Sequence, residues 1–92
     1  MKTLIIIPTY KEIENIERII GVLLRDNENL DILVMDDNSP DGTADAVKKI
    51  METSDRVHII ERPGKMGLGS AYVTGFRFAL EHDYEYIMEM DA

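Results

Sequence analysis

Carboxylates that could bind a ligand occur directly after two apolar segments of this 92-residue chain. Asp36 and Asp37 follow the apolar run at residues 32–35, and Asp91 follows the segment 86–90. Adjacent side chains on a strand point in opposite directions, so Asp36 and Asp37 cannot share one environment. We expect one of the two to support the following loop through backbone N–H groups, and the other to accept hydrogen bonds from a ligand.

Asp91 has the position of a ligand for a hard divalent cation, because it follows a strand and lies near the strand-end carboxylates of the second apolar run. Mg²⁺ takes one or two protein carboxylates and completes its shell with phosphate oxygens and water. A solvated surface charge is the simpler interpretation of a single aspartate. Taken alone, Asp91 therefore leaves both interpretations open.

The pentapeptide Pro8-Thr9-Tyr10-Lys11-Glu12 follows another apolar run, at residues 3–7. Thr9 and Glu12 have the spacing of a capping box, which satisfies backbone N–H groups at the start of a helix. Tyr10 is not part of that pattern. An aromatic ring in a strand-to-helix loop packs into the core or lies open to a flat ligand such as a nucleobase.

The glycine-rich segment GKMGLGSA (residues 64–71) precedes a predicted helix, whose N-terminus would attract anions. It fits neither a dinucleotide-binding G-x-G-x-x-G motif nor a P-loop, because Tyr72 takes the place of the last glycine and Met66 follows Lys65. The glycines therefore more simply permit a tight turn and close helix packing. Arg62 and Lys65 could meet a phosphate, although we expect at least one of them to be a solvated surface charge.

Hydrophobic periodicity predicts an alternation of strands and helices around these segments. The predicted strands are 3–7, 32–35, 57–60 and 86–90, and the predicted helices are 12–25, 40–52 and 68–82. This alternation predicts a parallel sheet with right-handed crossovers, in a Rossmann-like, three-layer β-α-β-α-β-α-β fold of the α/β class. Ligands of such sheets bind beyond the carboxyl ends of the strands, so the segments above should form one site.

Two details of the helices also follow from the sequence. Ser39 and Pro40 have the types expected of the N-cap and first residue of the second helix. Helical spacing places Tyr72, Phe76, Ala79 and Leu80 on one side of the third helix.

Composition excludes several classes of partner. The formal net charge of −8 argues against nucleic acid and against an anionic membrane surface as electrostatic partners. The absence of cysteine excludes disulfides and thiolate metal sites, and it fits a reducing compartment. No stretch reaches the length of a membrane span and the first residues lack a signal-peptide pattern, so we expect a cytoplasmic protein.

The segments IIIPTYKEIENI, ILVMDDNSPDGTADAV, GLGSAYVTGF and YIMEMDA, taken in order, resemble the N-terminal, nucleotide-sugar-binding half of family-2 glycosyltransferases. The resemblance covers essentially the whole chain and is greatest to dolichyl-phosphate mannose synthases and their prokaryotic polyprenyl-phosphate relatives. It implies the nucleotide-binding half of a GT-A domain, a GDP- or UDP-sugar donor, a polyprenyl or dolichyl phosphate acceptor and Mg²⁺ or Mn²⁺. The sugar it implies is mannose.

The resemblance also implies which residues contact the nucleotide. Asp37 matches the carboxylate that hydrogen-bonds the base, and Asp91 matches the first, metal-binding aspartate of an Asp-x-Asp motif. The remaining matches to nucleotide-contacting positions are Pro8, Tyr10, Glu12, Met35 through its backbone, and Ala92.

One departure from the family limits these expectations. The second aspartate of the Asp-x-Asp motif would be residue 93, and the acceptor-binding half and catalytic base of the family have no counterpart in residues 1–92. The chain is therefore expected to be a single truncated half-domain without catalytic residues, with little or no transferase activity alone. The alternative is a non-catalytic half-domain fragment with no ligand function.

The segment 86–90 carries a further expectation. It would lie inside the complete sheet of the family, whereas here it becomes an edge that carries Tyr86, Ile87, Met88 and Met90. Exposed apolar edges pair with other chains. We therefore expect self-association, most simply as a symmetric dimer.

Overall fold

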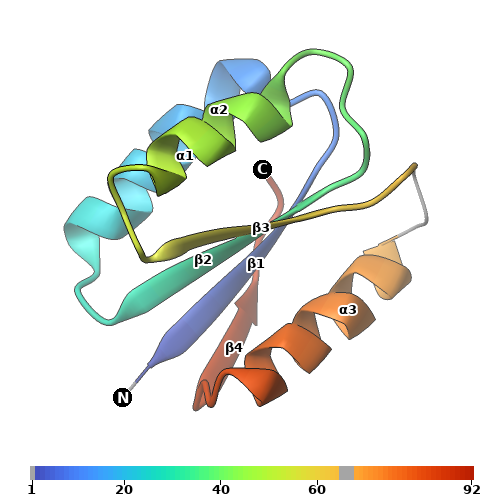
Figure 1. Cartoon of the computed structure of the whole chain (residues 1–92). Helices are drawn as coiled ribbons and strands as arrows, with labels where there is room; N and C mark the ends of the chain where they lie inside the picture. The colour runs from blue at the N-terminus through green and yellow to red at the C-terminus, as the bar shows by residue number, and fades with distance from the viewer. Residues whose placement is uncertain (1, 65–67) are drawn as a thin grey trace.

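The computed structural model describes residues 2–64 and 68–92 as a four-stranded parallel sheet with helices on both faces (Figure 1). The strand order is β3-β2-β1-β4. All seven predicted elements are present, so the predicted three-layer α/β fold is confirmed. Their bounds are β1 Thr3–Thr9, α1 Ile13–Asp26, β2 Leu30–Asp36, α2 Thr43–Met51, β3 Val57–Glu61, α3 Leu68–Glu81 and β4 Tyr86–Glu89.

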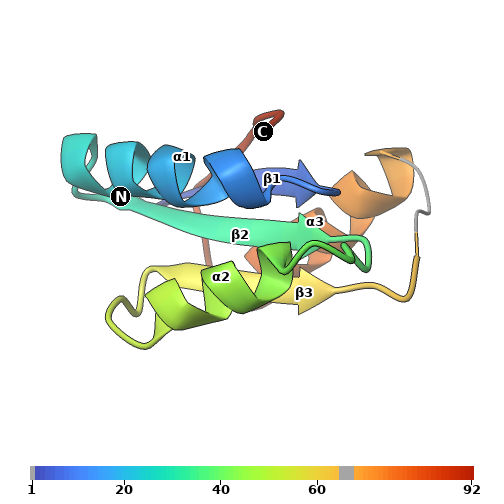
Figure 2. The same ribbon diagram turned by 90° about the horizontal axis from the view of Figure 1, so that it is seen from above.

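The two inner strands separate two apolar layers. In β1, Ile5 and Ile7 pack toward α1 and α2, while Leu4 and Ile6 pack toward α3. Figure 2 shows α1 and α2 side by side over the face opposite α3. All seven residues of β2 are buried. Burial on both faces is why these strands read as continuous apolar runs rather than as alternating patterns.

β1 continues through Pro8 to Thr9, two residues beyond the predicted strand. A proline in an inner strand removes a hydrogen-bond donor from the ladder. The main-chain nitrogen of Pro8 faces β4. It lies beyond the last hydrogen bond between β1 and β4, which runs from Met90 N to Ile6 O. The missing N–H therefore costs no pairing, and β1 can extend alongside β2 to the edge of the sheet.

The predicted start of the second helix is wrong. α2 begins at Thr43 rather than at Pro40, and its N-cap position is Gly42 instead of Ser39. Gly42 has a φ of 90°, a left-handed conformation that glycine adopts without strain. Asp41 accepts a hydrogen bond from Thr43 N at 3.1 Å, which fixes this later start.

The four residues predicted to lie on one side of the third helix do not share one environment. Phe76 and Leu80 are 37% and 74% exposed, whereas Ala71, Gly75 and Ala79 face the sheet. These small residues recur every four positions and let α3 approach the sheet closely. A Cβ on Gly75 would lie 2.5 Å from Ile6 Cδ1, so the backbone of α3 rests almost directly on β1.

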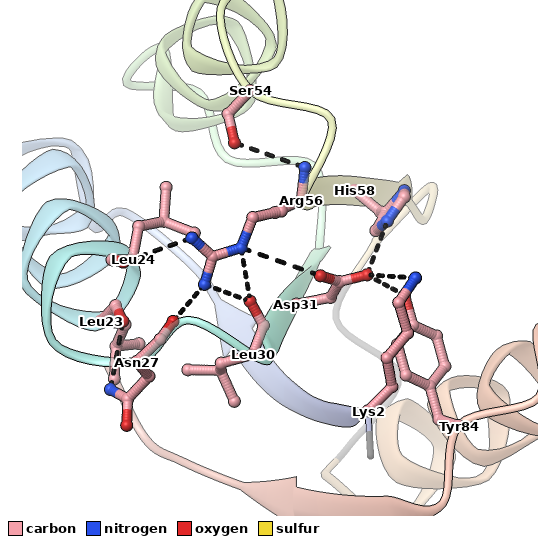
Figure 3. Close-up of polar contacts among 10 residues, drawn as sticks. All are labelled: Lys2, Leu23, Leu24, Asn27, Leu30, Asp31, Ser54, Arg56, His58 and Tyr84. Carbon is pink, nitrogen blue, oxygen red and sulfur yellow. Dashed lines mark hydrogen bonds and ion pairs between the residues drawn. The ribbon is translucent and has the colours of Figure 1, made fainter.

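A polar network holds the opposite, amino-terminal end of the sheet (Figure 3). Arg56 donates to the main-chain carbonyls of Leu24, Asn27 and Leu30, which ties the end of α1 to the start of β2. Asp31, which is 7% exposed, accepts a hydrogen bond from the Tyr84 hydroxyl. Burial and this bond raise the pKa of Tyr84. None of the helices in the described ranges is long and apolar enough to cross a membrane.

The close approach of α3 predicts opposite effects for two glycine-to-alanine variants. Gly75→Ala should lower the free energy of unfolding by about 1 kcal/mol, because the new methyl group displaces Ile6 in the packed core. Gly21→Ala, on the open side of α1, should raise it by about 0.5–1 kcal/mol through helix propensity. Urea unfolding measures both. A stability gain in Gly75→Ala would contradict the packing of α3.

Candidate functional site

The carboxyl ends of β1 and β2 form one edge of the candidate site. Pro8 is opposite Met35 and Thr9 is opposite Asp36 in the parallel register. One further bond, from Asp37 N to Thr9 O at 3.1 Å, extends the pairing beyond β2. Met35 is fully buried as a whole residue, so a contact between its main chain and a ligand stays a prediction.

Asp36 is the carboxylate that supports the loop, as predicted for one member of the pair. It is 1% exposed and accepts hydrogen bonds from the Thr9 hydroxyl at 2.7 Å, Ser39 N at 3.0 Å and the Ser39 hydroxyl at 2.7 Å. Three donors from two segments therefore compensate the burial of this charge. Asp36 joins the end of β1 to the loop that leads to α2.

Asp37 points the other way and is not free, contrary to the prediction. Its two oxygens accept hydrogen bonds from Arg62 Nε at 2.6 Å and Nη2 at 2.8 Å. Arg62 Nη1 also donates to the Ser70 hydroxyl at 2.9 Å. Arg62 is 7% exposed, so it is neither a solvated surface charge nor an open phosphate ligand in this structure. The ion pair joins the ends of β2, β3 and the first turn of α3.

The loop between β2 and α2 caps α1. Lys11 N donates to Ser39 Oγ at 2.9 Å, Glu12 N to Thr43 Oγ1 at 3.1 Å and Ile13 N to Asp41 Oδ2 at 3.3 Å. The predicted capping box is wrong, because the Thr9 hydroxyl donates to Asp36 instead. These three N–H groups are therefore already satisfied and do not offer hydrogen bonds to a ligand.

Tyr10 and Lys11 lie at the exposed tip of the β1–α1 loop. Tyr10 is 38% exposed, so its ring lies open to solvent rather than in the core. Lys11 Nζ is 5.4 Å from the centroid of that ring, within the range of a cation–π contact. Lys11 also has a φ of 58°, which is uncommon for a residue with a side chain. Glu12 is half-buried, and its carboxylate accepts a 3.5 Å bond from Asn15.

Asp91 and Ala92 are exposed beyond the end of β4. The bond from Met90 N to Ile6 O, 3.0 Å long, fixes where the chain leaves the sheet. Burial raises the pKa of Tyr72 on α3, and the negative charges of Asp91 and Glu89 raise it further. Asp91 follows β4, whose carboxyl end is at the same edge of the parallel sheet as those of β1 and β2.

A surface hollow of about 480 Å³ lies elsewhere, between α1 and α2. Ile13, Gly42 and Ala46 form part of its lining, and Tyr10, Asp37 and Asp91 do not. Its walls are side chains of two amphipathic helices. The strand ends are the better candidate because they carry the buried carboxylates and the exposed ring. The segment of the glycine-rich loop that includes Lys65 and Gly67 lies outside the described residues.

Comparison with known proteins identifies the family. Residues 4–92 match the model of a family described as glycosyl transferase family 2. The chain belongs to this family. The resemblance of the four strand-end segments to family-2 glycosyltransferases is therefore confirmed.

Individual relatives of this family-2 chain are polyprenyl-phosphate mannosyltransferases by name. It is 46% identical to an undecaprenyl-phosphate mannosyltransferase of Micrococcus luteus, over 100% of this chain and 38% of that protein. It is 45% identical to a polyprenol monophosphomannose synthase of Mycolicibacterium smegmatis, over 99% of this chain and 35% of that protein. The chain thus spans less than two-fifths of the length of either relative.

A solved structure supports the fold of this family-2 chain. The mannosyltransferase PcManGT from Pyrobaculum calidifontis, in complex with GDP-Man and Mn²⁺, superposes with a TM-score of 0.74 and 28% identity. The match covers 85% of this chain and 24% of that one. The α/β sheet described above is therefore the fold of part of a GT-A glycosyltransferase.

The residues of the family-2 chain give only part of a metal site. Among residues 2–64 and 68–92, no group of three or more histidine or acidic side chains is placed to hold a metal ion. Asp91 offers one exposed carboxylate at the site edge. A single carboxylate fits a Mg²⁺ or Mn²⁺ ion that takes most of its ligands from a diphosphate and water. The assignment of Asp91 as the metal ligand stays a prediction.

Arg62 is the site residue whose role the sequence did not predict. Two signals were available: Arg62 directly follows the strand at 57–61, and Asp37 directly follows the strand at 30–36. Had those strands been predicted as neighbours, the two opposite charges would have been expected to meet at one edge. Strand order was the missing information, because periodicity does not reveal which strands are adjacent.

The cap on α1 predicts an acid-sensitive contribution to stability. Hydrogen bonds from the Thr43 hydroxyl, Ile13 N and Thr43 N lower the pKa of Asp41 below its usual 3.8, against a smaller opposing effect of burial. A depressed folded-state pKa contributes stability above pH 3.8 that is lost as the pH falls further. Asp41→Asn should therefore show a shallower loss of unfolding free energy below that pH than the wild type.

Denaturant unfolding at several acidic pH values measures this slope. Thr43→Val keeps Asp41 but removes its most important donor, so its slope should be intermediate. Equal slopes for wild type and Asp41→Asn would show that the cap does not perturb this carboxyl.

Proposed function

We propose that this chain forms the nucleotide-sugar-binding half of a glycosyltransferase that transfers mannose to a polyprenyl phosphate. The observation that carries the proposal is the open Tyr10 ring at the same sheet edge as the fixed Asp37 carboxylate. An exposed ring stacks on a base, and a carboxylate accepts its N–H groups. The names of the mannosyltransferase relatives and the GDP-Man complex support the sugar and favour GDP over UDP.

Each site residue then has a proposed role. Tyr10 stacks on the base, and Asp37 accepts a hydrogen bond from it. Pro8, near the end of β1, and Glu12, directly before α1, contact the nucleoside. Asp91 and Ala92 lie where the diphosphate would reach the end of β4.

A divalent cation at Asp91 would stabilise the negative charge of the departing nucleoside diphosphate. The proposed task of the residues described here is narrower: they hold the nucleotide in a fixed position at the edge of the sheet. No general base for the acceptor is assigned to them. We propose that residues 1–92 act as one half-domain that binds nucleotide without completing sugar transfer.

Calorimetric titration with GDP and UDP, with and without Mn²⁺, tests nucleotide binding. Tyr10→Ala should weaken GDP binding roughly tenfold or more, because base stacking on an aromatic ring is worth about 1–3 kcal/mol. Asp37→Ala should abolish detectable binding, provided that circular dichroism shows the variant to be folded. Tyr86→Ala removes an exposed tyrosine on β4, away from the base residues, and should bind like the wild type. No binding at millimolar GDP by a folded chain would remove this proposal.

We also propose that the chain associates with itself through β4. This strand is at the edge of the sheet, and Tyr86 and Met88 are 52% and 54% exposed on one of its faces. The prediction that Ile87 is exposed is wrong, because this side chain is partly buried against the apolar layer between the sheet and α3. The main-chain N–H groups of Tyr86 and Met90 point to β1, so by alternation that of Glu89 points to the free edge.

Glu89→Pro therefore provides a specific test of edge pairing. It removes one free-edge N–H group without removing a hydrogen bond to β1, and proline is tolerated on such edges. Light scattering should show a dimer for the wild type and for Glu89→Gln, and a monomer for Glu89→Pro. A monomeric wild type at high concentration would exclude self-association through β4.

A further inference from the structure

The ion pair between Asp37 and Arg62 is more tightly built than a surface salt bridge. Both side chains are at least nine-tenths buried, and two hydrogen bonds of 2.6 and 2.8 Å join them. The Ser70 hydroxyl accepts a hydrogen bond from Arg62 Nη1 at 2.9 Å, and the main-chain Arg62 N donates to Asp36 O at 2.8 Å. Arg62 is therefore fixed at its main chain and at three nitrogens of its side chain.

This geometry limits what Asp37 can offer a ligand. A carboxylate has about four lone-pair positions, and the arginine fork occupies one on each oxygen. A guanine edge that presents two N–H groups would need the same side of the carboxylate that Arg62 occupies. Asp37 can therefore accept one N–H from a base at an outer lone pair, in a direction set by the plane of the guanidinium.

We propose that Arg62, held by Ser70, is the positioning residue that sets the orientation of Asp37 for base recognition. This inference rests on the nucleotide-binding function proposed above. A planar two-point contact prevents the carboxylate from rotating about its Cβ–Cγ bond, which a lysine ammonium would not do. The consequence concerns specificity: losing the fork weakens contacts to the base and spares contacts to the diphosphate.

The alternative is a purely structural ion pair that joins β2 to β3. Arg56 offers the matched comparison at the opposite end of the sheet, since it is also fixed by several hydrogen bonds, to carbonyls of Leu24, Asn27 and Leu30 (Figure 3). Replacing either arginine by lysine removes structural contacts. Only the replacement at the ligand edge should change how the protein discriminates the base.

The experiment compares the dissociation constants of GDP and of pyrophosphate, both with Mn²⁺, for wild type, Arg62→Lys, Ser70→Ala and Arg56→Lys. Arg62→Lys should weaken GDP binding about tenfold, as expected for loss of an oriented charged hydrogen bond, and leave pyrophosphate binding within twofold. Ser70→Ala keeps the ion pair and is the milder variant. Its GDP binding should weaken about threefold. Arg56→Lys should lower Tm without changing the GDP-to-pyrophosphate ratio.

The outcomes separate this inference from the proposed function. If the wild type binds GDP and neither Arg62→Lys nor Ser70→Ala changes the ratio of the two constants, the pair is structural and the positioning role is overturned. If Arg62→Lys weakens the binding of GDP and of pyrophosphate equally, the effect is a general loss of the fold. The positioning role is then again overturned, unless Ser70→Ala weakens GDP binding without weakening pyrophosphate binding. If the folded wild type binds neither ligand, the proposed function falls and the recognition role falls with it.

Discussion

The two adjacent carboxylates at the end of β2 organise one whole edge of the sheet. Asp36 and Asp37 point to opposite sides, and both are almost completely buried. A buried carboxylate is costly unless donors surround it, so each aspartate requires partners from other segments. Asp36 takes them from β1 and from the β2–α2 loop, and Asp37 takes them from Arg62 at the end of β3. Arg62 in turn donates to Ser70, so one dipeptide joins β1, the β2–α2 loop, the end of β3 and, through Arg62, the start of α3.

Further order follows from that dipeptide. Ser39, held by Asp36, accepts a hydrogen bond from Lys11 N, and the neighbouring Asp41 and Thr43 satisfy the next N–H groups of α1. The start of α1 therefore depends on the loop after β2, and the loop depends on Asp36. The exposed Tyr10 lies directly before this cap. Its exposed ring therefore projects from a loop whose main chain is fixed at the next residue, Lys11.

Buried polar groups at the two ends of the sheet find their partners in different ways. At the amino end, Asp31 lies within 4.0 Å of cationic groups of Lys2 and Arg56 and accepts a hydrogen bond from Tyr84, while Arg56 also donates to main-chain carbonyls. At the carboxyl end, Asp37 is paired with Arg62 and Asp36 is bonded to neutral donors, and the exposed ring of Tyr10 lies at the same edge. That difference fits the general rule that parallel sheets bind ligands at their carboxyl edge and use the other edge for stability.

The sequence by itself determined the α/β class, the number and order of the elements and the edge at which the site should lie. Hydrophobic periodicity and strand-end residues are local signals, and the four quoted segments were enough to indicate the glycosyltransferase family. The sequence misplaced the start of α2 and did not predict which side of α3 faces the sheet. Pro40 satisfies the local rules for a helix start, and Phe76 is more apolar than Gly75, yet distant contacts to α1 and Ile6 decided both cases.

Only the tertiary structure decided which carboxylate supports the loop and which one meets Arg62. It also decided that Ser39, Asp41 and Thr43 cap α1. The physical reason is the same each time. Buried polar groups must find partners wherever the strand order brings them, and that order, β3-β2-β1-β4, is a property of the whole sheet that local patterns in the sequence do not reveal.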